Sequence, residues 1–177
     1  IPSIIMQSIS AFLTTLLNLI LIGFSEAAVS VLGVYYKLQS FVFMPVFGLT
    51  HGLMPIMGFN YGAQKKKRIY SAMKIGTIIA VAIMLLGTLL FEFFPGELLM
   101  IFDASQEMLD IGIIAFRLVA ICFIPAAVGI ISSTLFQAIG MGSKSLVISL
   151  LRQLAVILPA AWLFSLIGLD YVWLAFP

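Results

Sequence analysis

Apolar residues occur in long runs that short polar segments separate. The first run, residues 3–24, contains no charged residue at all. An α-helix needs about 20 apolar residues to cross the hydrocarbon core of a bilayer. The pattern therefore predicts five complete membrane spans and the start of a sixth, at residues 3–24, 29–57, 75–94, 111–139, 146–167 and 171–177.

These runs are apolar on every side, which favours helices over strands. The strands of a membrane barrel alternate in polarity over about ten residues, and none of these runs alternates. In hydrocarbon, every backbone polar group must be paired within its own helix or in a closed barrel. The sequence therefore predicts an all-α fold, a polytopic transmembrane helix bundle.

Composition agrees with a membrane protein. Hydrophobic residues make up 63% of the chain and charged residues only 9%, against about 25% charged residues in a typical soluble domain. A soluble domain would leave too much of that apolar surface in water. Because the chain starts at Ile1 and stops at Pro177 inside an apolar stretch, we expect it to be a fragment of a longer protein.

The connecting segments alternate in charge. Lys65–Arg68 is entirely basic, the next long connection, Glu97–Asp110, has acidic residues and no basic one, and the last two carry Lys144 and Asp170. Basic loops stay on the cytoplasmic side of a membrane. We therefore expect a multi-pass protein of the cytoplasmic (inner) membrane, with Lys65–Arg68 in the cytoplasm and Glu97–Asp110 outside.

Enzyme motifs are missing from the sequence. It contains no G-x-S-x-G, no H-E-x-x-H and no P-loop pattern. With one histidine (His51) and one cysteine (Cys122), the chain cannot form a His-pair metal site or a disulfide framework. We expect no enzymatic activity, no catalytic or metal-binding residues and no cofactor.

Polar residues in the first run share one face. They recur at spacings of three and four, which places them within an arc of about 80° on a helix. Such a stripe must face protein or water, so it indicates either a seam with another helix or the wall of a wet cavity. The larger amides are the better cavity candidates, because they are costly to bury unpaired. The members of the stripe are Ser3, Gln7, Ser10, Thr14 and Asn18.

The second run places aromatic and polar residues on one face. Aromatic rings attract cations, so this face is suited to flat, apolar cations; ordinary helix packing is the simpler interpretation. The residues are Tyr36, Gln39, Ser40, Phe43 and Phe47.

Prolines interrupt the apolar runs. A proline inside a helix removes a hydrogen bond and kinks the helix. Kinked helices are typical of transporters that open alternately to two sides, although proline is common in membrane helices generally. The kink candidates are Pro45, Pro55, Pro125 and Pro159.

The segment FMPVFGLTHGLMPIMGFNYGAQKKKRIYSAMKIG (43–76) resembles the second span and basic loop of the C-terminal bundle in the multidrug and toxic-compound extrusion (MATE) family. Residues 135–164 are similar to the turn between the fourth and fifth spans of that bundle, and residues 1–18 to its first helix. The resemblance implies two six-helix bundles around a central cavity, of which this chain is the C-terminal one. It also implies export of cationic or amphipathic drugs, driven by Na⁺ or H⁺.

The predicted function is thus a cation-coupled antiporter that exports such drugs across the cytoplasmic membrane. Its expected partners are the lipid bilayer, the drugs and the missing N-terminal bundle of the same protein, and no nucleic acid. The candidates for the substrate cavity are Gln7, Ser10, Thr14, Asn18, Tyr36, Gln39 and Phe43.

The coupling ion is expected to bind outside this chain. A branch of the family carries an acidic residue in the first helix of this bundle, and Ser10 lies near that position here. No Asp or Glu occurs between Glu26 and Glu92, or between Asp110 and Asp170. The resemblance therefore places the coupling carboxylate in the other bundle.

Two other functions stay open. A lipid-linked oligosaccharide flippase of the same superfamily would need basic residues in its cavity to bind pyrophosphate. Lys37, Arg117 and Arg152 would then point inward, whereas otherwise they reach to the membrane interface. A non-transporting membrane scaffold would instead tolerate changes along the polar stripe.

Overall fold

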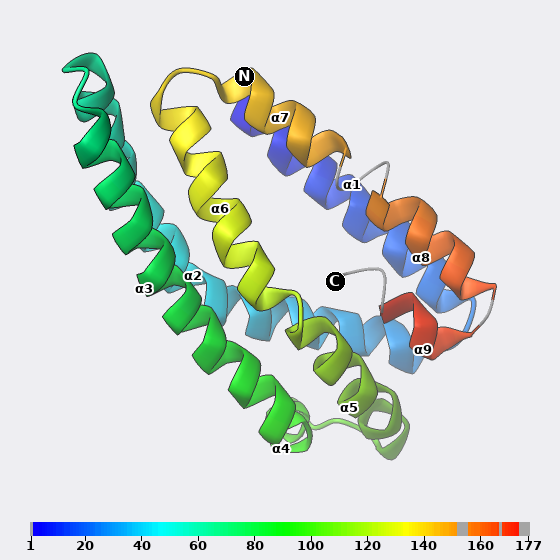
Figure 1. The fold of residues 1–177 in the computed structure, drawn as a ribbon. Helices are drawn as coiled ribbons and strands as arrows, with labels where there is room; N and C mark the ends of the chain where they lie inside the picture. Colours follow the sequence, from blue (N-terminus) through cyan, green and yellow to red (C-terminus); the bar gives the residue numbers. More distant parts are fainter. Residues whose placement is uncertain (1, 152–155, 167, 174–177) are drawn as a thin grey trace.

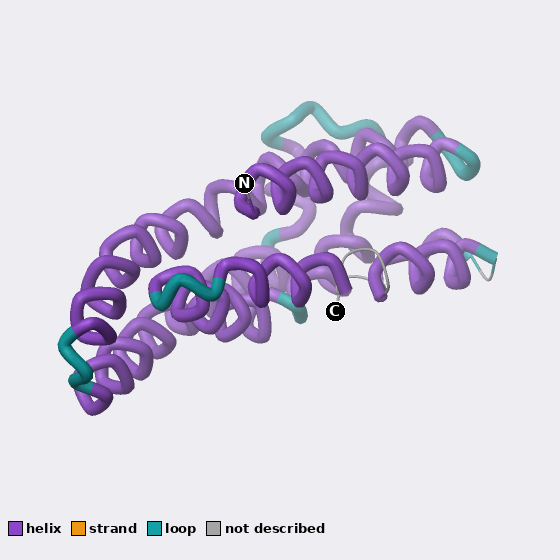
Figure 2. Tube along the Cα trace, turned by 90° about the horizontal axis from the view of Figure 1, so that it is seen from above, coloured by secondary structure: helices purple, strands orange, loops and turns teal. Residues whose placement is uncertain are grey.

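The computed structural model describes residues 2–151, 156–166 and 168–173, which are helical apart from short turns (Figures 1 and 2). Within these ranges, the side chains of residues 2–7, 9, 10, 149, 158, 170 and 171 are not described. No strand occurs in the described chain, so the all-α prediction is confirmed. The helices are α1 (Pro2–Ile22), α2 (Glu26–Gly62), α3 (Lys66–Phe93), α4 (Pro95–Met100), α5 (Gln106–Ala120), α6 (Phe123–Ala138), α7 (Gly142–Leu150), α8 (Leu158–Ser165) and α9 (Leu169–Val172).

Two of these helices, α2 and α3, are long and apolar enough to cross a membrane by themselves. The bent pair α5 and α6 qualifies as a third span if the two helices are taken together. Within the described part of the chain, length and hydropathy therefore support two or three spans. The remaining expected spans, along α1 and along α7 and α8, stay predictions, and residues 174–177 of the expected start of a sixth span lie outside the described residues.

The helices α2 and α3 extend beyond the apolar runs that predict them. Ser25 caps the start of α2, where its hydroxyl accepts a hydrogen bond from the backbone N–H three residues later. α2 ends at Gly62 and α3 already begins at Lys66, so most of the basic run belongs to a helix and not to a loop. Hydropathy marks only the part of a helix that lies in hydrocarbon, whereas Lys and Arg are good helix formers in water.

The expected single span at residues 111–139 is divided into α5 and α6, which are bent by 48°. The break at residues 121–122 precedes Pro125, whose nitrogen carries no hydrogen to pair with the Ile121 carbonyl. At the same place the Thr88 hydroxyl, from α3, donates to the Ala120 carbonyl oxygen at 3.2 Å. Broken membrane helices are tolerated where a neighbouring Ser or Thr satisfies the freed backbone in this way.

The other proline candidates lie in two kinds of position. Pro45 and Pro55 stand inside α2, which continues through both as one helix. Pro159 lies in the first turn of α8, where proline costs no helical hydrogen bond. The expected span at 146–167 contains α7 and α8, and its residues 152–155, including Arg152, lie outside the described residues.

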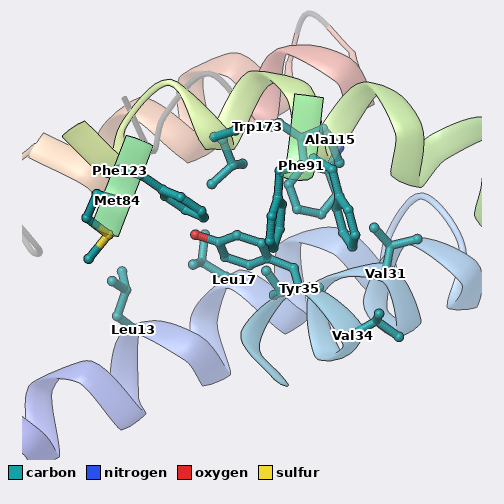
Figure 3. Packing of buried hydrophobic residues seen from close by; sticks show 14 of the residues in the cluster. Leu13, Leu17, Val31, Val34, Tyr35, Met84, Phe91, Ala115, Phe123 and Trp173 are labelled. Carbon is teal, nitrogen blue, oxygen red and sulfur yellow. The ribbon is translucent and has the colours of Figure 1, made fainter. Parts of the chain in front are cut away.

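The helices form two groups that meet at a shared core (Figure 1). α2, α3, α5 and α6 pack on one another, while α1 packs mainly on α7 and also contacts α2 and α8. Aromatic rings fill the centre of the first group: Tyr35 lies 6.3 Å edge-on from Phe91, and Phe91 lies 5.0 Å from Phe116 and 5.2 Å from Phe123. Figure 3 shows Leu17 of α1 close to the Tyr35 ring, so α1 closes this core from one side.

Glycine permits the close contact between α2 and α3. A Cβ added at Gly76 would overlap Cδ1 of Leu53, and one added at Gly87 would overlap Cγ1 of Val42. Small residues let membrane helices approach closely, and packing drives their association because lipid supplies no hydrophobic force between them. The pairing of the two longest helices therefore depends on these two positions.

Basic and acidic residues gather at opposite ends of the bundle. Lys65–Arg68 lies at the α2–α3 turn, and Lys144 follows α6, whose last residue Ala138 lies beside Gly58 near the same end of α2. The acidic segment Glu97–Asp110 surrounds α4 and the start of α5, at the far end of α3 (Figure 1). The charge alternation along the sequence thus becomes a charge difference between two ends.

Candidate substrate-binding surface

The polar stripe of α1 and the aromatic face of α2 meet at Thr14 and Tyr36. Their side chains form a hydrogen bond between the two helices. Both residues are half-buried, so the pair lies at the edge of the core and not inside it. This contact supports the interpretation of the stripe as a seam between two helices. Because both residues are only half-buried, one edge of that seam stays accessible.

Two amide residues lie next to this pair. A short turn joins α1 and α2, which run in opposite directions. Asn18 lies one turn after Thr14, closer to that connection. Gln39 lies about one turn after Tyr36, farther from it. Both amides are half-buried. The two amides therefore extend the polar edge in both directions along the seam.

Phe43 continues the same face of α2 and connects it with the core. Its ring lies 5.3 Å edge-on from Phe123 and 6.2 Å from Phe47, which is 48% exposed. Tyr36 is backed in the same manner by the buried Tyr35, 5.4 Å away. Accessible aromatic rings are thus supported by packed aromatic rings behind them, which restricts their movement.

We refer to these residues as the α1–α2 surface. Gln7 and Ser10 also lie on α1, but their side chains are outside the described residues. Ser40 is exposed and its hydroxyl donates to the Tyr36 carbonyl oxygen at 2.8 Å, so it is bonded within its own helix. The α1–α2 surface consists of Thr14, Asn18, Tyr36, Gln39 and Phe43.

Two hollows of the structure are not lined by the α1–α2 surface. One hollow, of about 420 Å³, lies between α1 and α8 and is bounded by Leu16, Pro159 and Trp162 among others. The second, of about 290 Å³, lies where α2, α3 and α6 come together. The α1–α2 surface is therefore separate from both of these hollows.

The basic residues Lys37 and Arg117 do not belong to this surface. Among the described residues, no group of three His, Cys, Asp or Glu side chains is placed to hold a metal ion. The ammonium group of Lys37 lies 5.6 Å from the centre of the Phe102 ring, which is a cation–π contact with the acidic end of the bundle. Arg117 is exposed in the last turn of α5.

A polar cluster between α6 and α7 was not predicted. The hydroxyls of Ser133 and Ser145 are in hydrogen-bond contact, and the Gln137 amide donates to Ser133 at 3.3 Å. Ser145 is buried, with 2% of its surface exposed. This cluster joins the two helix groups. The four-residue spacing of Ser133 and Gln137 is the signal that could have revealed it.

The fold defines a multi-pass helical membrane protein, and this surface gives it a partly accessible polar and aromatic face. The MatE family model matches residues 2–163, and the chain belongs to that family. The fold prediction of a MATE-like bundle is therefore confirmed, because the chain also superimposes closely on solved MATE structures. Residue roles on the α1–α2 surface stay predictions.

Curated relatives include multidrug export protein MepA of Staphylococcus aureus strain MSSA476, which is 24% identical over 97% of this chain and 38% of its own length. The protein of the same name from Staphylococcus saprophyticus is 23% identical with the same coverage. The chain thus spans about two fifths of the length of the curated relatives it matches.

Solved structures give the same result for the fold. An outward-facing multidrug resistance MATE family transporter matches with a TM-score of 0.93 and 24% identity, over 99% of this chain and 40% of that one. A MOP superfamily transporter from Pyrococcus furiosus matches with a TM-score of 0.92 and 24% identity, over 99% and 40%. These likenesses establish the shared architecture of the bundle.

Proposed function

We propose that this chain is the C-terminal half of an antiporter that exports cationic or amphipathic drugs across the cytoplasmic membrane. The observation that carries the proposal is the α1–α2 surface, where the Thr14–Tyr36 hydrogen bond, two amides and accessible aromatic rings lie along one edge. A polar edge on a membrane helix is costly unless it faces protein or water. The names of the curated relatives as multidrug export proteins support the same function.

Aromatic rings, and not carboxylates, would recognise the drug in this half. α1 contains no Asp or Glu, and the only one in α2 is Glu26 in its first turn. A cation held over a Tyr or Phe ring gains about 0.5–1 kcal/mol at exposed sites and about 2 kcal/mol when water is excluded. Such contacts tolerate many ligand shapes, which suits the export of diverse drugs.

The driving ion, Na⁺ or H⁺, would bind in the other half of the protein. The described spans of this chain contain no carboxylate on the α1–α2 surface to take up either cation. In the membrane, the basic end with Lys65–Arg68 would face the cytoplasm and the acidic end the outside. Export would then carry the drug from the basic end toward the acidic end.

The positions of the basic residues favour drug export over the transport of a pyrophosphate-linked lipid. A pyrophosphate site would need several inward basic side chains. Lys37 instead lies over the Phe102 ring at the acidic end. In the described chain, no basic side chain belongs to the α1–α2 surface.

The test is dye accumulation in efflux-deficient cells that express the full-length protein carrying this sequence, with and without a Na⁺ gradient. Reduced accumulation of cationic dyes that is lost without the gradient supports Na⁺-coupled export, and reduced accumulation that persists supports H⁺ coupling. Unchanged accumulation of several cationic dyes, with the protein present in the membrane, would overturn drug export.

A further inference from the structure

The hollow between α2, α3 and α6 combines apolar walls with a basic rim. Its volume is about 290 Å³. It is formed by the end of α2, the first turns of α3 and the last turn of α6, so it bridges three helices at the basic end of the bundle. Its walls include Tyr61, Lys66, Tyr70, Met73, Leu135 and Ile139.

The basic residues at this rim have no partners within the described chain. Lys66 lines the hollow, and its neighbours Lys65, Lys67 and Arg68 are exposed. None of these four side chains forms an ion pair or a hydrogen bond with another described residue. Four basic residues therefore follow one another without compensation from the described part of the chain, and one of them, Lys66, lines the hollow.

The position of these charges at the start of α3 favours the binding of an anion there. The first turn of α3 contains no acidic residue, and Lys65 at its N-cap gives no side-chain cap. Positive charge is unfavourable at a helix N-terminus, where free backbone N–H groups attract anions. An anion at this place would offset both the helix dipole and the repulsion among the four basic residues.

The described chain has no carboxylate that could serve as this anion. The nearest acidic residues in the sequence are Glu26, at the far end of α2, and Glu92, at the far end of α3. At 1.5 Å per residue along a helix, both are roughly 40 Å or more from the rim. The anion must therefore come from outside the described residues.

The apolar walls indicate a lipid and not a free anion. Tyr61 and Tyr70, 47% and 72% exposed, have the amphipathic rings that are typical of the membrane–water interface. Below them, Met73, Leu135 and Ile139 form a surface that a phosphate ion alone would not use. Basic pockets between membrane helices on the cytoplasmic side are suited to anionic lipid head groups.

We propose that this hollow binds an anionic phospholipid. The lipid phosphate lies between Lys66 and the start of α3, and the first part of an acyl chain lies against Met73, Leu135 and Ile139. Because the walls come from both α3 and α6, the bound lipid ties α6 to the α2–α3 pair.

The test is native mass spectrometry of the delipidated full-length protein, titrated with phosphatidylglycerol or with phosphatidylcholine. We expect phosphatidylglycerol to bind more tightly, and Lys66→Gln to weaken its binding by about fivefold. Lys66→Arg keeps the charge and should retain binding. The matched control, Arg68→Gln, removes one exposed charge of the same basic run that does not line the hollow, and it should change the affinity little.

A third variant separates a lipid from a free anion. Ile139→Trp fills the apolar part of the hollow and should weaken phosphatidylglycerol binding while leaving Lys66 in place. Inorganic phosphate, added as a competitor, should not displace the bound lipid. An equal loss of lipid affinity in the control variant would show attraction to general surface charge only. Full displacement of the lipid by inorganic phosphate would show a simple anion site. Either result overturns the proposal.

Discussion

The hydroxyl of Thr88 reaches from α3 to the carbonyl oxygen of Ala120, 3.2 Å away, at the place where α5 ends. The same hydroxyl lies 2.9 Å from the Met84 carbonyl oxygen of its own helix. The Thr88 hydroxyl thus contacts a carbonyl oxygen of its own regular helix and one at the break in the neighbouring helix. The 48° bend between α5 and α6 is therefore supported by a hydrogen bond from another helix.

Thr88→Val should destabilise the bundle. Valine has the same shape but no hydroxyl, so the Ala120 carbonyl would lose this donor at the break. Hydrogen bonds between membrane helices contribute about 0.6 kcal/mol on average and up to about 1.7 kcal/mol. We expect a loss of about 1 kcal/mol in the free energy of unfolding, measured on the purified full-length protein in detergent.

Thr77→Val is the matched control for this prediction. Thr77 lies on the same helix and makes no side-chain hydrogen bond within the described chain. Its substitution should leave stability nearly unchanged. Equal losses for the two variants would mean that the Thr88 hydroxyl does not support the break.

The sequence predicts the class of fold because bilayer thickness imposes a simple length rule on apolar runs. It does not predict where helices end outside the hydrocarbon. Lys66 begins α3, nine residues before the apolar run that predicts that helix, because charged residues continue a helix into water. Pro125 marks a kink candidate next to the break at residues 121–122, but the sequence does not reveal the hydrogen bond that supports the break, since it comes from Thr88, a residue more than thirty positions away.

The candidate site could be predicted only in part. Helical spacing correctly places Tyr36, Gln39 and Phe43 along one helix, because residues three or four apart share a face. The contact between Thr14 and Tyr36 depends on how α1 packs against α2, which spacing within a single helix does not contain. The Ser133–Ser145 contact was missed for the same reason.

Gly87→Ala should weaken the packing of α3 on α2. The added methyl group would overlap Cγ1 of Val42, and both backbones are held in regular helices. Overpacking of this kind typically costs about 1–3 kcal/mol. We expect a lower thermal stability of the full-length protein, and partial recovery when Val42→Ala is combined with Gly87→Ala.

Gly52→Ala serves as the control for Gly87→Ala. Gly52 lies in α2 with no atom near the position of an added Cβ. Alanine is about 1 kcal/mol more favourable than glycine inside a helix, so this substitution should be neutral or stabilising. If Gly87→Ala is equally harmless, the close contact between the two helices is not required for the fold.

Tyr36→Phe and Thr14→Val should show energetic coupling. Each substitution removes one side of the hydrogen bond between α1 and α2, so the double variant should lose less stability than the sum of the single variants. Because phenylalanine keeps the aromatic face, Tyr36→Phe should retain most dye export, whereas Tyr36→Ala should lose it. Additive stability effects would contradict the bond, and full export by Tyr36→Ala would contradict the role of the ring.

Cysteine labelling tests which face of the bundle meets water. In a background where Cys122 is replaced by alanine, cysteines at Asn18 and Gln39 should react with a water-soluble thiol reagent in the full-length protein, because the α1–α2 surface is proposed to line an aqueous cavity. Cysteines at Ile78 and Leu86, exposed on α3 within its apolar span, should react far more slowly, since thiol reagents need a thiolate and lipid excludes both water and charge. Addition of a transported dye should protect Gln39 in particular, because it lies beside the Tyr36 ring. Equal labelling of both pairs would show that the polar stripe of α1 is a helix seam without a cavity, and the proposed route of the drug would then have to lie elsewhere.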